Sequence, residues 1–130
     1  MIHPLDPAAL DRLAATLPAG TPVFMLNLLR FAPDGGRAAY FDRYVPAFRA
    51  IAAELGVEGA GAIWIGQVAG IVAGPADEAW DAALVVRYPS LGAFRAIVES
   101  PRYRATAAPH REGALLDWRL IAQTEAARPA

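Results

Sequence analysis

The fold class of this chain is decided by one stretch, Val23-Phe24-Met25-Leu26-Asn27-Leu28-Leu29-Arg30-Phe31. The stretch is apolar on both of its faces, and Asn27 interrupts the apolar run. A strand that is apolar on both faces belongs in the middle of a sheet that is covered on both sides. The sequence therefore predicts a central strand at 23–31 with one polar side chain in its interior.

Three more strands are expected further along the chain, at 60–72, 80–88 and about 115–123. The glycines of the first of these segments predict a bulge or a strong bend. The second is apolar on both faces over 82–86, as 23–31 is. We therefore expect 23–31 and 80–88 to be the two central strands of one sheet.

Helical spacing of apolar residues fills the segments between these strands. It predicts a short helix after Asp6, a helix over 37–55 that Pro46 should kink or split, and a helix from about 91 to 98. A short helical piece should follow Ser100, and 107–113 should be a loop that leads into the last strand. The order is therefore a helix and then β-α-β-β-α-β.

Right-handed crossovers fold this order into an α+β, ferredoxin-like antiparallel sheet with its helices on one face. The first and third strands are expected to form the central pair and to run parallel to each other. The predicted organisation is an N-terminal helical extension at 1–20, the ferredoxin-like domain at 21–123, and a flexible tail at 124–130.

The free face of this sheet predicts a homodimer. Hydrophobic residues make up 55% of the chain and charged residues only 19%. Apolar side chains of the central strands would be exposed on that face, and covering them with the same face of a second copy is worth about 25 cal/mol per Å². We expect two sheets to close into a dimeric α/β barrel with the helices outside.

Composition excludes several classes of function. The chain has no cysteine, which excludes disulfides, thiolate zinc sites and iron–sulfur clusters and fits a cytoplasmic location. A net charge of -1 leaves no basic patch for nucleic acid. No segment has the length of a membrane span, and no signal peptide is visible. We expect no cofactor and no metal, because the motifs for phosphate or dinucleotide binding and metal-ligand spacing are missing.

Four stretches of the chain resemble family 1330 of the domains of unknown function, in the dimeric α/β-barrel superfamily. They are 25–31, 80–90, 100–103 and 110–121, in the order that the family has, and the resemblance covers roughly 21–123. It implies a homodimer with a ligand-sized pocket in each subunit. The wider superfamily is similar in fold to cofactor-free monooxygenases, small isomerases and decarboxylases, and haem-handling proteins, so the resemblance implies no single reaction.

The two central strands end alike, because Arg30 and Arg87 each precede an aromatic residue and a proline. If both arginines lie at one end of the sheet, near helix N-termini, they would suit a carboxylate or a phosphate. The alternative is that each arginine pairs with Asp81, Asp117 or Glu112 and only stabilises the fold.

Asn27 and His110 are the candidate catalytic residues. A buried carboxamide must be hydrogen-bonded, so Asn27 either ties the strand to a neighbouring element or polarises a ligand carbonyl. Histidine is the usual general base near neutral pH, although a loop histidine such as His110 is more often exposed and without a role.

The candidate ligand-binding residues are aromatic side chains and arginines: Arg30, Tyr44, Trp64, Arg87, Tyr88, Tyr103 and Arg111. The alternative is that the aromatic residues belong to the core or to the dimer surface. Three functions follow. The first is a cofactor-independent enzyme, monooxygenase- or isomerase-like, for an aromatic or acidic metabolite. The second is a non-catalytic ligand-binding or scaffold homodimer, and the third is a haem-handling protein with His110 as axial ligand.

Overall fold

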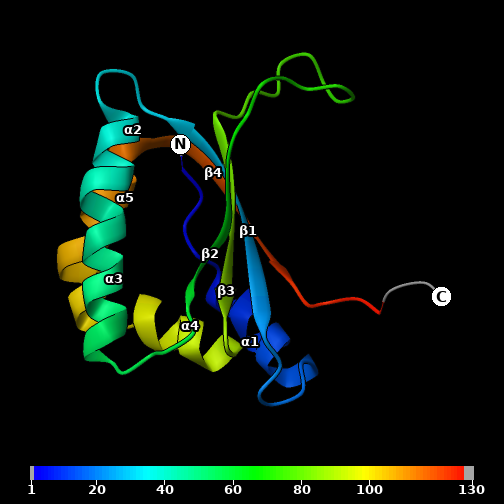
Figure 1. Ribbon diagram of the computed structural model, residues 1–130, viewed down its shortest axis with the longest axis vertical. Coiled ribbons are helices and arrows are strands. Elements are labelled where there is room, and N and C mark those ends of the chain that lie inside the picture. The colour runs from blue at the N-terminus through cyan, green and yellow to red at the C-terminus, as the bar shows by residue number, and fades with distance from the viewer. Residues whose placement is uncertain (1, 128–130) are drawn as a thin grey trace.

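A four-stranded antiparallel sheet with the order β2-β3-β1-β4 forms one layer of the protein, and helices form the other (Figure 1). The computed structural model describes residues 2–127. Its elements are α1 (Pro7–Thr16), β1 (Val23–Phe31), α2 (Gly36–Ala39), η1 (Tyr40–Tyr44), α3 (Val45–Glu54), β2 (Gly61–Gln67), β3 (Ala82–Tyr88), α4 (Leu91–Val98), η2 (Tyr103–Ala107), α5 (Ala108–Ala114) and β4 (Leu115–Gln123). The predicted α+β, ferredoxin-like fold class is confirmed.

The two central strands are β1 and β3, as expected, but the expectation that they run parallel is wrong. They are antiparallel, with Phe24 opposite Arg87 and Leu29 opposite Ala82. The connections require this direction. A β-α-β crossover makes β1 and β2 parallel, the direct connection makes β3 antiparallel to β2, and β3 must therefore oppose β1.

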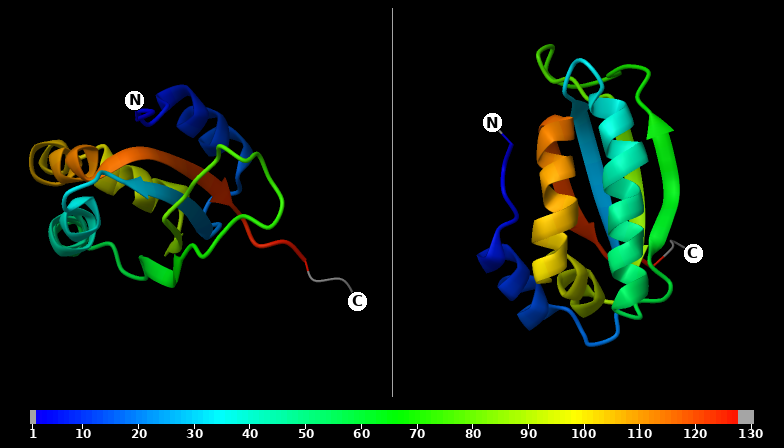
Figure 2. Two further views of the ribbon diagram at one scale, coloured as in Figure 1. Left: turned by 90° about the horizontal axis from the view of Figure 1, so that it is seen from above. Right: turned by 90° about the vertical axis from the view of Figure 1, so that its left-hand side faces the viewer.

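Each central strand presents one face to the helices and one face away from them. In β1 the side chains of Val23, Met25, Asn27, Leu29 and Phe31 are buried, and those between them are half-buried. Figure 2 shows α2, α3, α4 and α5 together on one face of the sheet. We call the other side the open face; it carries Phe24, Leu26, Leu28, Val85 and Ile121.

Pro46 does not break its helix. α2, η1 and α3 run as one continuous helix (Figure 1), and η1 is a single π-turn closed by the Val45 N–H on the Tyr40 carbonyl. Pro46 stands at the start of α3, where a missing N–H costs little, and the wide turn before it makes room for the ring.

A π-turn followed by a proline in the first turn of a helix also occurs in the second half of the chain. The Ala108 N–H donates to the Tyr103 carbonyl and closes the π-turn η2, and Pro109 stands at the start of α5. The expected loop at 107–113 is therefore wrong. Residues 103–114 are helical, because Pro109 lies in a first turn that needs no N–H from it.

The N-terminal segment packs against one edge of the domain. Asp6 caps α1 through its side chain, as predicted, and Leu10 is its buried residue. The helix lies beside α4, with a 3.1 Å ion pair between Asp11 and Arg95, and Trp118 Nε1 donates to the His3 carbonyl.

Two further differences concern loops and ends. β2 is shorter than expected, and the loop from 68 to 81 extends beyond the sheet (Figure 1). The bulge predicted in this strand is confirmed, between Ala62 and Trp64. Part of the predicted tail, 128–130, lies outside the described residues.

Candidate functional site

A cavity of about 240 Å³ lies between α3 and the β3 side of the sheet. Because the strand periodicity turns Asn27, Leu84 and Tyr88 toward the helices, these side chains form its floor. Tyr40, Tyr44 and Phe48 cover it from the long helix, among other residues. We call this space the sheet cavity.

All four tyrosines of the chain are buried around the sheet cavity or directly behind it. The rings of Tyr40 and Tyr44 lie 5.0 Å apart, and Tyr103 meets Tyr44 edge-on at 6.2 Å. The centre of the Phe48 ring lies 6.2 Å from that of Tyr88 and 6.3 Å from that of Tyr103. The result is an aromatic wall whose polar atoms are hydroxyl groups.

A chain of hydrogen bonds leads from this wall into the helix layer. The hydroxyl oxygens of Tyr44 and Tyr103 are 2.9 Å apart, and Nη1 of Arg111 donates to the Tyr103 oxygen at 2.7 Å. Arg111 is itself buried, and its guanidinium lies 4.4 Å from the centre of the Trp118 ring. The Tyr103 oxygen therefore accepts from Arg111 and also takes part in the hydrogen bond with Tyr44, in which either hydroxyl can donate.

Burial sets the protonation state of these phenols. It raises the pKa of Tyr40, Tyr44 and Tyr88 well above the usual value of 10.0, and neighbouring tyrosines raise each further. Burial also raises the pKa of Tyr103, against the opposing effects of Arg111 and of the Tyr44 hydrogen bond. All four stay neutral near pH 7 and can donate hydrogen bonds.

Three polar groups on the cavity wall have unused hydrogen-bonding capacity. The Asn27 amide nitrogen donates to the Met25 carbonyl at 3.1 Å, which leaves its side-chain oxygen as an acceptor. Within residues 2–127 no hydrogen bond reaches the hydroxyl of Tyr40 or of Tyr88. Polar groups that face a cavity in this way are completed by water or by a ligand.

The structure brings together five of the nine residues proposed from sequence: Asn27, Tyr44, Tyr88, Tyr103 and Arg111. Asn27, Tyr44 and Tyr88 line the sheet cavity, and the other two lie behind it. Whether they bind a ligand stays a prediction.

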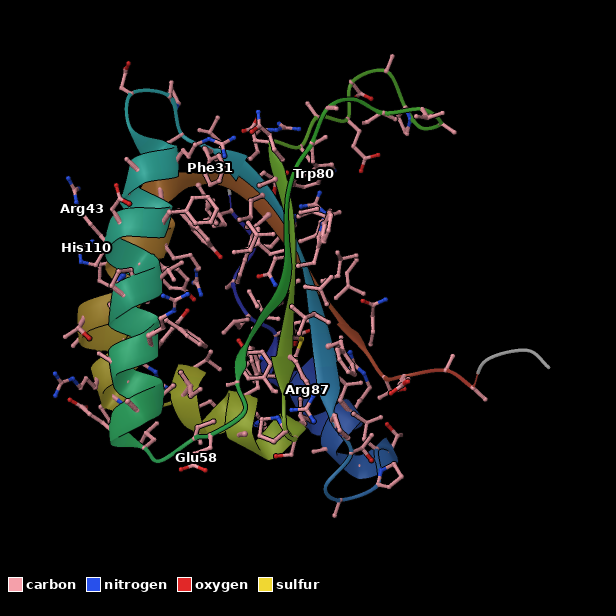
Figure 3. All side chains as sticks on the ribbon, in the orientation of Figure 1. Phe31, Arg43, Glu58, Trp80, Arg87 and His110 are labelled. Carbon is pink, nitrogen blue, oxygen red and sulfur yellow. The ribbon has the colours of Figure 1, made fainter. Side chains whose placement is uncertain are left out.

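The expectation that Arg30 and Arg87 converge is wrong. They lie at opposite ends of the sheet because β1 and β3 are antiparallel. Arg30 donates from Nε to the Ala79 carbonyl at 2.8 Å and covers the Trp80 ring, whereas Arg87 donates to the Gly59 carbonyl at 3.2 Å. Figure 3 shows Trp80 and Arg87 far apart along the sheet. Both arginines therefore hold a loop in place by a hydrogen bond to one of its carbonyl groups. Neither has an ion pair within the described residues.

Trp64 and His110 also lie away from the sheet cavity. Trp64 is 64% exposed on the open face, where its indole lies over Gly66. His110 is exposed on the outer side of α5 and points away from the sheet (Figure 3). A histidine in that place has no path to a ligand in the sheet cavity of the same subunit.

Sequence reasoning treated Tyr40 and Phe48 only as apolar helix positions and missed their place in the site. A signal was present. Each half of the chain has a tyrosine at the start of a π-turn and a proline in the first turn of the helix that follows. The pairs are Tyr40 with Pro46 and Tyr103 with Pro109. π-Turns are frequent at functional sites, so this repeat marks both tyrosines.

The described part of the chain shows neither a metal-binding cluster nor a membrane-spanning helix. It contains no group of three or more acidic or histidine side chains placed to hold a metal ion. None of its helices combines the length and the hydropathy needed to cross a bilayer.

Two solved structures of RPA0582, a protein of unknown function from Rhodopseudomonas palustris, are similar to this chain. The structure of methylated RPA0582 is 32% identical, with a TM-score of 0.79, over 98% of this chain and 96% of that chain. This chain belongs to the RPA0582 family. The second RPA0582 structure is 29% identical, with a TM-score of 0.75, over 98% and 100% of the two chains.

Membership of the RPA0582 family carries the fold and no activity, because RPA0582 is itself of unknown function. A dimeric protein of unknown function with a ferredoxin-like fold, from Bacteroides fragilis NCTC 9343, is 14% identical, with a TM-score of 0.53 over 80% of this chain and 96% of that chain. This likeness shows the fold alone. No family model and no curated protein matches the chain.

Proposed function

We propose that this protein is a homodimer that binds a small aromatic molecule with a carbonyl or hydroxyl oxygen in the sheet cavity. The observation that carries the proposal is the set of incompletely bonded polar groups on Asn27, Tyr40 and Tyr88. The rest of the lining is apolar except for Tyr44 and the exposed Arg49. Small-molecule sites have this character, with mostly hydrophobic linings and a few polar groups that fix orientation.

The size of the cavity supports a single-ring ligand. A dry cavity of about 150 Å³ accepts benzene. The sheet cavity, at about 240 Å³, has room for one ring and a small substituent. The faces of Tyr44 and Phe48 offer stacking or edge contacts to such a ring, and the hydroxyls of Tyr40 and Tyr88 offer donors to its oxygen.

Binding is better supported than proton transfer. The cavity lining, as far as the structure describes it, includes neither a carboxylate nor an imidazole, and its phenols hold their protons. The site is therefore a hydrogen-bond donor to a ligand oxygen. For a cofactor-independent isomerase- or monooxygenase-like reaction, these donors would supply one part, the polarisation of a substrate carbonyl.

The homodimer is supported by the open face of the sheet. On this face Leu26 of β1 lies opposite Val85 of β3 and Ile121 of β4. Leu28 lies opposite Ala83 and Arg119. A contiguous apolar face of this kind marks a contact surface. The Bacteroides fragilis neighbour is described as dimeric. Membership of family 1330, which the four matching stretches suggest, and the cytoplasmic location are further parts of the proposal.

The test is a ligand screen with a variant that fills the cavity. Ala52 is buried at its wall, so Ala52→Phe should occupy the ring position, whereas Ala50→Phe makes the same change on the exposed side of α3. Phenols, aryl ketones and quinones are screened by thermal shift, and hits are measured by calorimetry. A ligand that binds the native protein raises its melting temperature by mass action.

The expected result is a hit that binds the wild type and the Ala50→Phe variant and fails to bind the Ala52→Phe variant. Asn27→Val should weaken the same hit without preventing folding. Hits that bind Ala52→Phe as tightly as the wild type would place the ligand elsewhere. A screen of all three chemical classes without any hit would leave the scaffold homodimer as the better account.

A further inference from the structure

Arg111 is a buried cation whose hydrogen bonds are incomplete. Its side chain is 7% exposed, and one nitrogen, Nη1, donates to the Tyr103 hydroxyl at 2.7 Å. Nε is fully buried and has no partner within the described residues. Nη2 makes no hydrogen bond there, and its nearest carboxylate oxygen is Oε1 of Glu112, at 3.9 Å.

Aromatic rings surround the guanidinium without neutralising it. Its central carbon lies 4.4 Å from the centre of the Trp118 ring and 5.9 Å from that of Tyr103. Cation–π contacts stabilise a charge but accept no conventional hydrogen bond. A buried charge needs a counter-charge and bonds for its remaining protons. Among residues 2–127, Glu112 is the one carboxylate close enough to Arg111 to form an ion pair, and it is 60% exposed.

A second cavity, of about 330 Å³, lies against Arg111 on the far side of Tyr103 from the sheet cavity. We call it the N-terminal cavity, because Ile2, Pro4, Leu5 and Leu10 form one wall. Val98 of α4 adds to this apolar lining. Tyr103 separates the two cavities, since its hydroxyl bonds Tyr44 on one side and Arg111 on the other.

The two guanidinium nitrogens without hydrogen bonds share one edge. Nε–H and one N–H of Nη2 are parallel within the guanidinium plane, and together they match the two oxygens of a carboxylate. Nη1, on the other edge, is already used by Tyr103. Arg111 therefore keeps its carboxylate-binding edge while the opposite edge anchors it to the fold.

We propose that the N-terminal cavity is a second binding site, which holds an organic carboxylate with a short apolar body. The carboxylate binds the Nε–Nη2 edge of Arg111, and the apolar body lies against Leu5, Leu10 and Val98. This site is independent of the one proposed for the sheet cavity, because its ligand is anionic and it uses a different wall. The competing occupant of the same edge is the carboxylate of Glu112, after a side-chain rotation.

The test follows the Nε–Hε resonance of Arg111 by nitrogen–proton correlation NMR of the full-length protein. Hexanoate, hexanamide and inorganic phosphate are titrated separately. Hexanoate should shift the Arg111 resonance saturably and raise the melting temperature. Hexanamide, which has the same body without the charge, should do neither, and inorganic phosphate should give less than a tenth of the affinity of hexanoate.

Variants locate the effect. Arg111→Lys keeps the charge but loses the paired donors, so hexanoate affinity should fall at least tenfold. Arg43→Lys makes the same change on the exposed face of the long helix and should leave it unchanged (Figure 3). Ala52→Phe, which fills the sheet cavity, should also leave hexanoate binding unchanged, so failure at one site is distinguished from failure at the other.

Several outcomes would overturn the proposal. One is the absence of a saturable shift of the wild-type Arg111 resonance with hexanoate. This titration uses only the wild-type protein, so it stands even if Arg111→Lys does not fold. An equal response to hexanamide would show that only the apolar body is recognised, and an equal response to phosphate would remove the carboxylate assignment. If Glu112→Gln moves the Arg111 resonance of the ligand-free protein and hexanoate does not move that of the wild type, Glu112 is the counter-ion.

Discussion

The hydroxyl groups of Tyr44 and Tyr103 meet at 2.9 Å, and this contact joins the two β-α-β halves of the domain through their helices. Each tyrosine belongs to a π-turn, η1 in the first half and η2 in the second. A π-turn shifts the side chains that follow relative to an α-helix. The pair therefore depends on both irregular turns, and it links the cavity wall to Arg111.

Loss of the Tyr103 hydroxyl should destabilise the protein more than loss of the Tyr44 hydroxyl. Tyr103→Phe removes the hydrogen bond that the Arg111 guanidinium makes within residues 2–127 and should cost about 1.5–3 kcal/mol. Tyr44→Phe removes a neutral bond worth about 1 kcal/mol. Urea unfolding of the two single variants and the double variant measures both costs and their coupling. Equal costs for the two single variants would show that Tyr103 does not hold the arginine.

The stability of the protein should fall steeply in alkali. Burial raises the pKa of Tyr40, Tyr44, Tyr88 and Tyr103 above 10.0 in the folded state. The unfolded chain ionises near 10.0, so between this value and the folded pKa it binds fewer protons than the folded chain does. The contribution of these groups is complete below pH 10 and is lost as the pH rises above it.

Thermal unfolding measured across this pH range checks the alkaline prediction. Tyr40→Phe, which removes one of the ionisable groups, should lose less stability than the wild type over the same interval. Tyrosinate absorption that appears near pH 10 while the protein is still folded would mean that the cavity phenols are accessible to hydroxide.

A methyl group at Gly36 should destabilise the fold, whereas one at Gly113 should not. A Cβ on Gly36 would lie 2.6 Å from the Ala114 carbonyl oxygen, which already accepts a hydrogen bond from the Ala32 N–H and cannot move freely. Gly36→Ala should cost about 1–3 kcal/mol. Gly113 lies in α5 with nothing near the added atom, so Gly113→Ala should stabilise by up to about 1 kcal/mol. Chemical denaturation of both variants measures the difference, and similar midpoints would contradict the contact.

A charge on the open face should separate the proposed dimer. Leu26→Lys places an ammonium group among Val85 and Ile121, whereas Ala50→Lys places it on the exposed face of α3. Sedimentation velocity at micromolar concentration should show a dimer for the wild type and for Ala50→Lys and a monomer for Leu26→Lys. A wild-type monomer would refute the pairing of sheets.

The fold could be predicted because burial leaves a repeating signal in the sequence. β1 and β3 are apolar on both faces, since helices cover one face and the other is the apolar open face. The apolar pattern of a strand predicts whether it is central or at an edge of the sheet. The pattern does not predict in which direction the strand runs, and the direction of β3 relative to β1 follows only from tracing each connection in turn.

The candidate site could be predicted only in part. Asn27 was visible as a polar residue in an apolar strand, and Tyr44 as a residue of the helix above it. The neighbourhood of Tyr103 and Arg111 was hidden, because η2 and α5 form a helix where Pro109 indicated a loop. The same error put His110 near the sheet, although it lies on the outer surface.

The register of β1 with β4 also bears on mechanical strength. Phe24, near the start of β1, lies opposite Gln123, at the end of β4, and the two strands are antiparallel. Tension applied to the two chain ends would therefore unzip this ladder one bond at a time from that end, instead of shearing many bonds at once. An optical trap should find that the domain yields at low force, however stable it is to heat or urea.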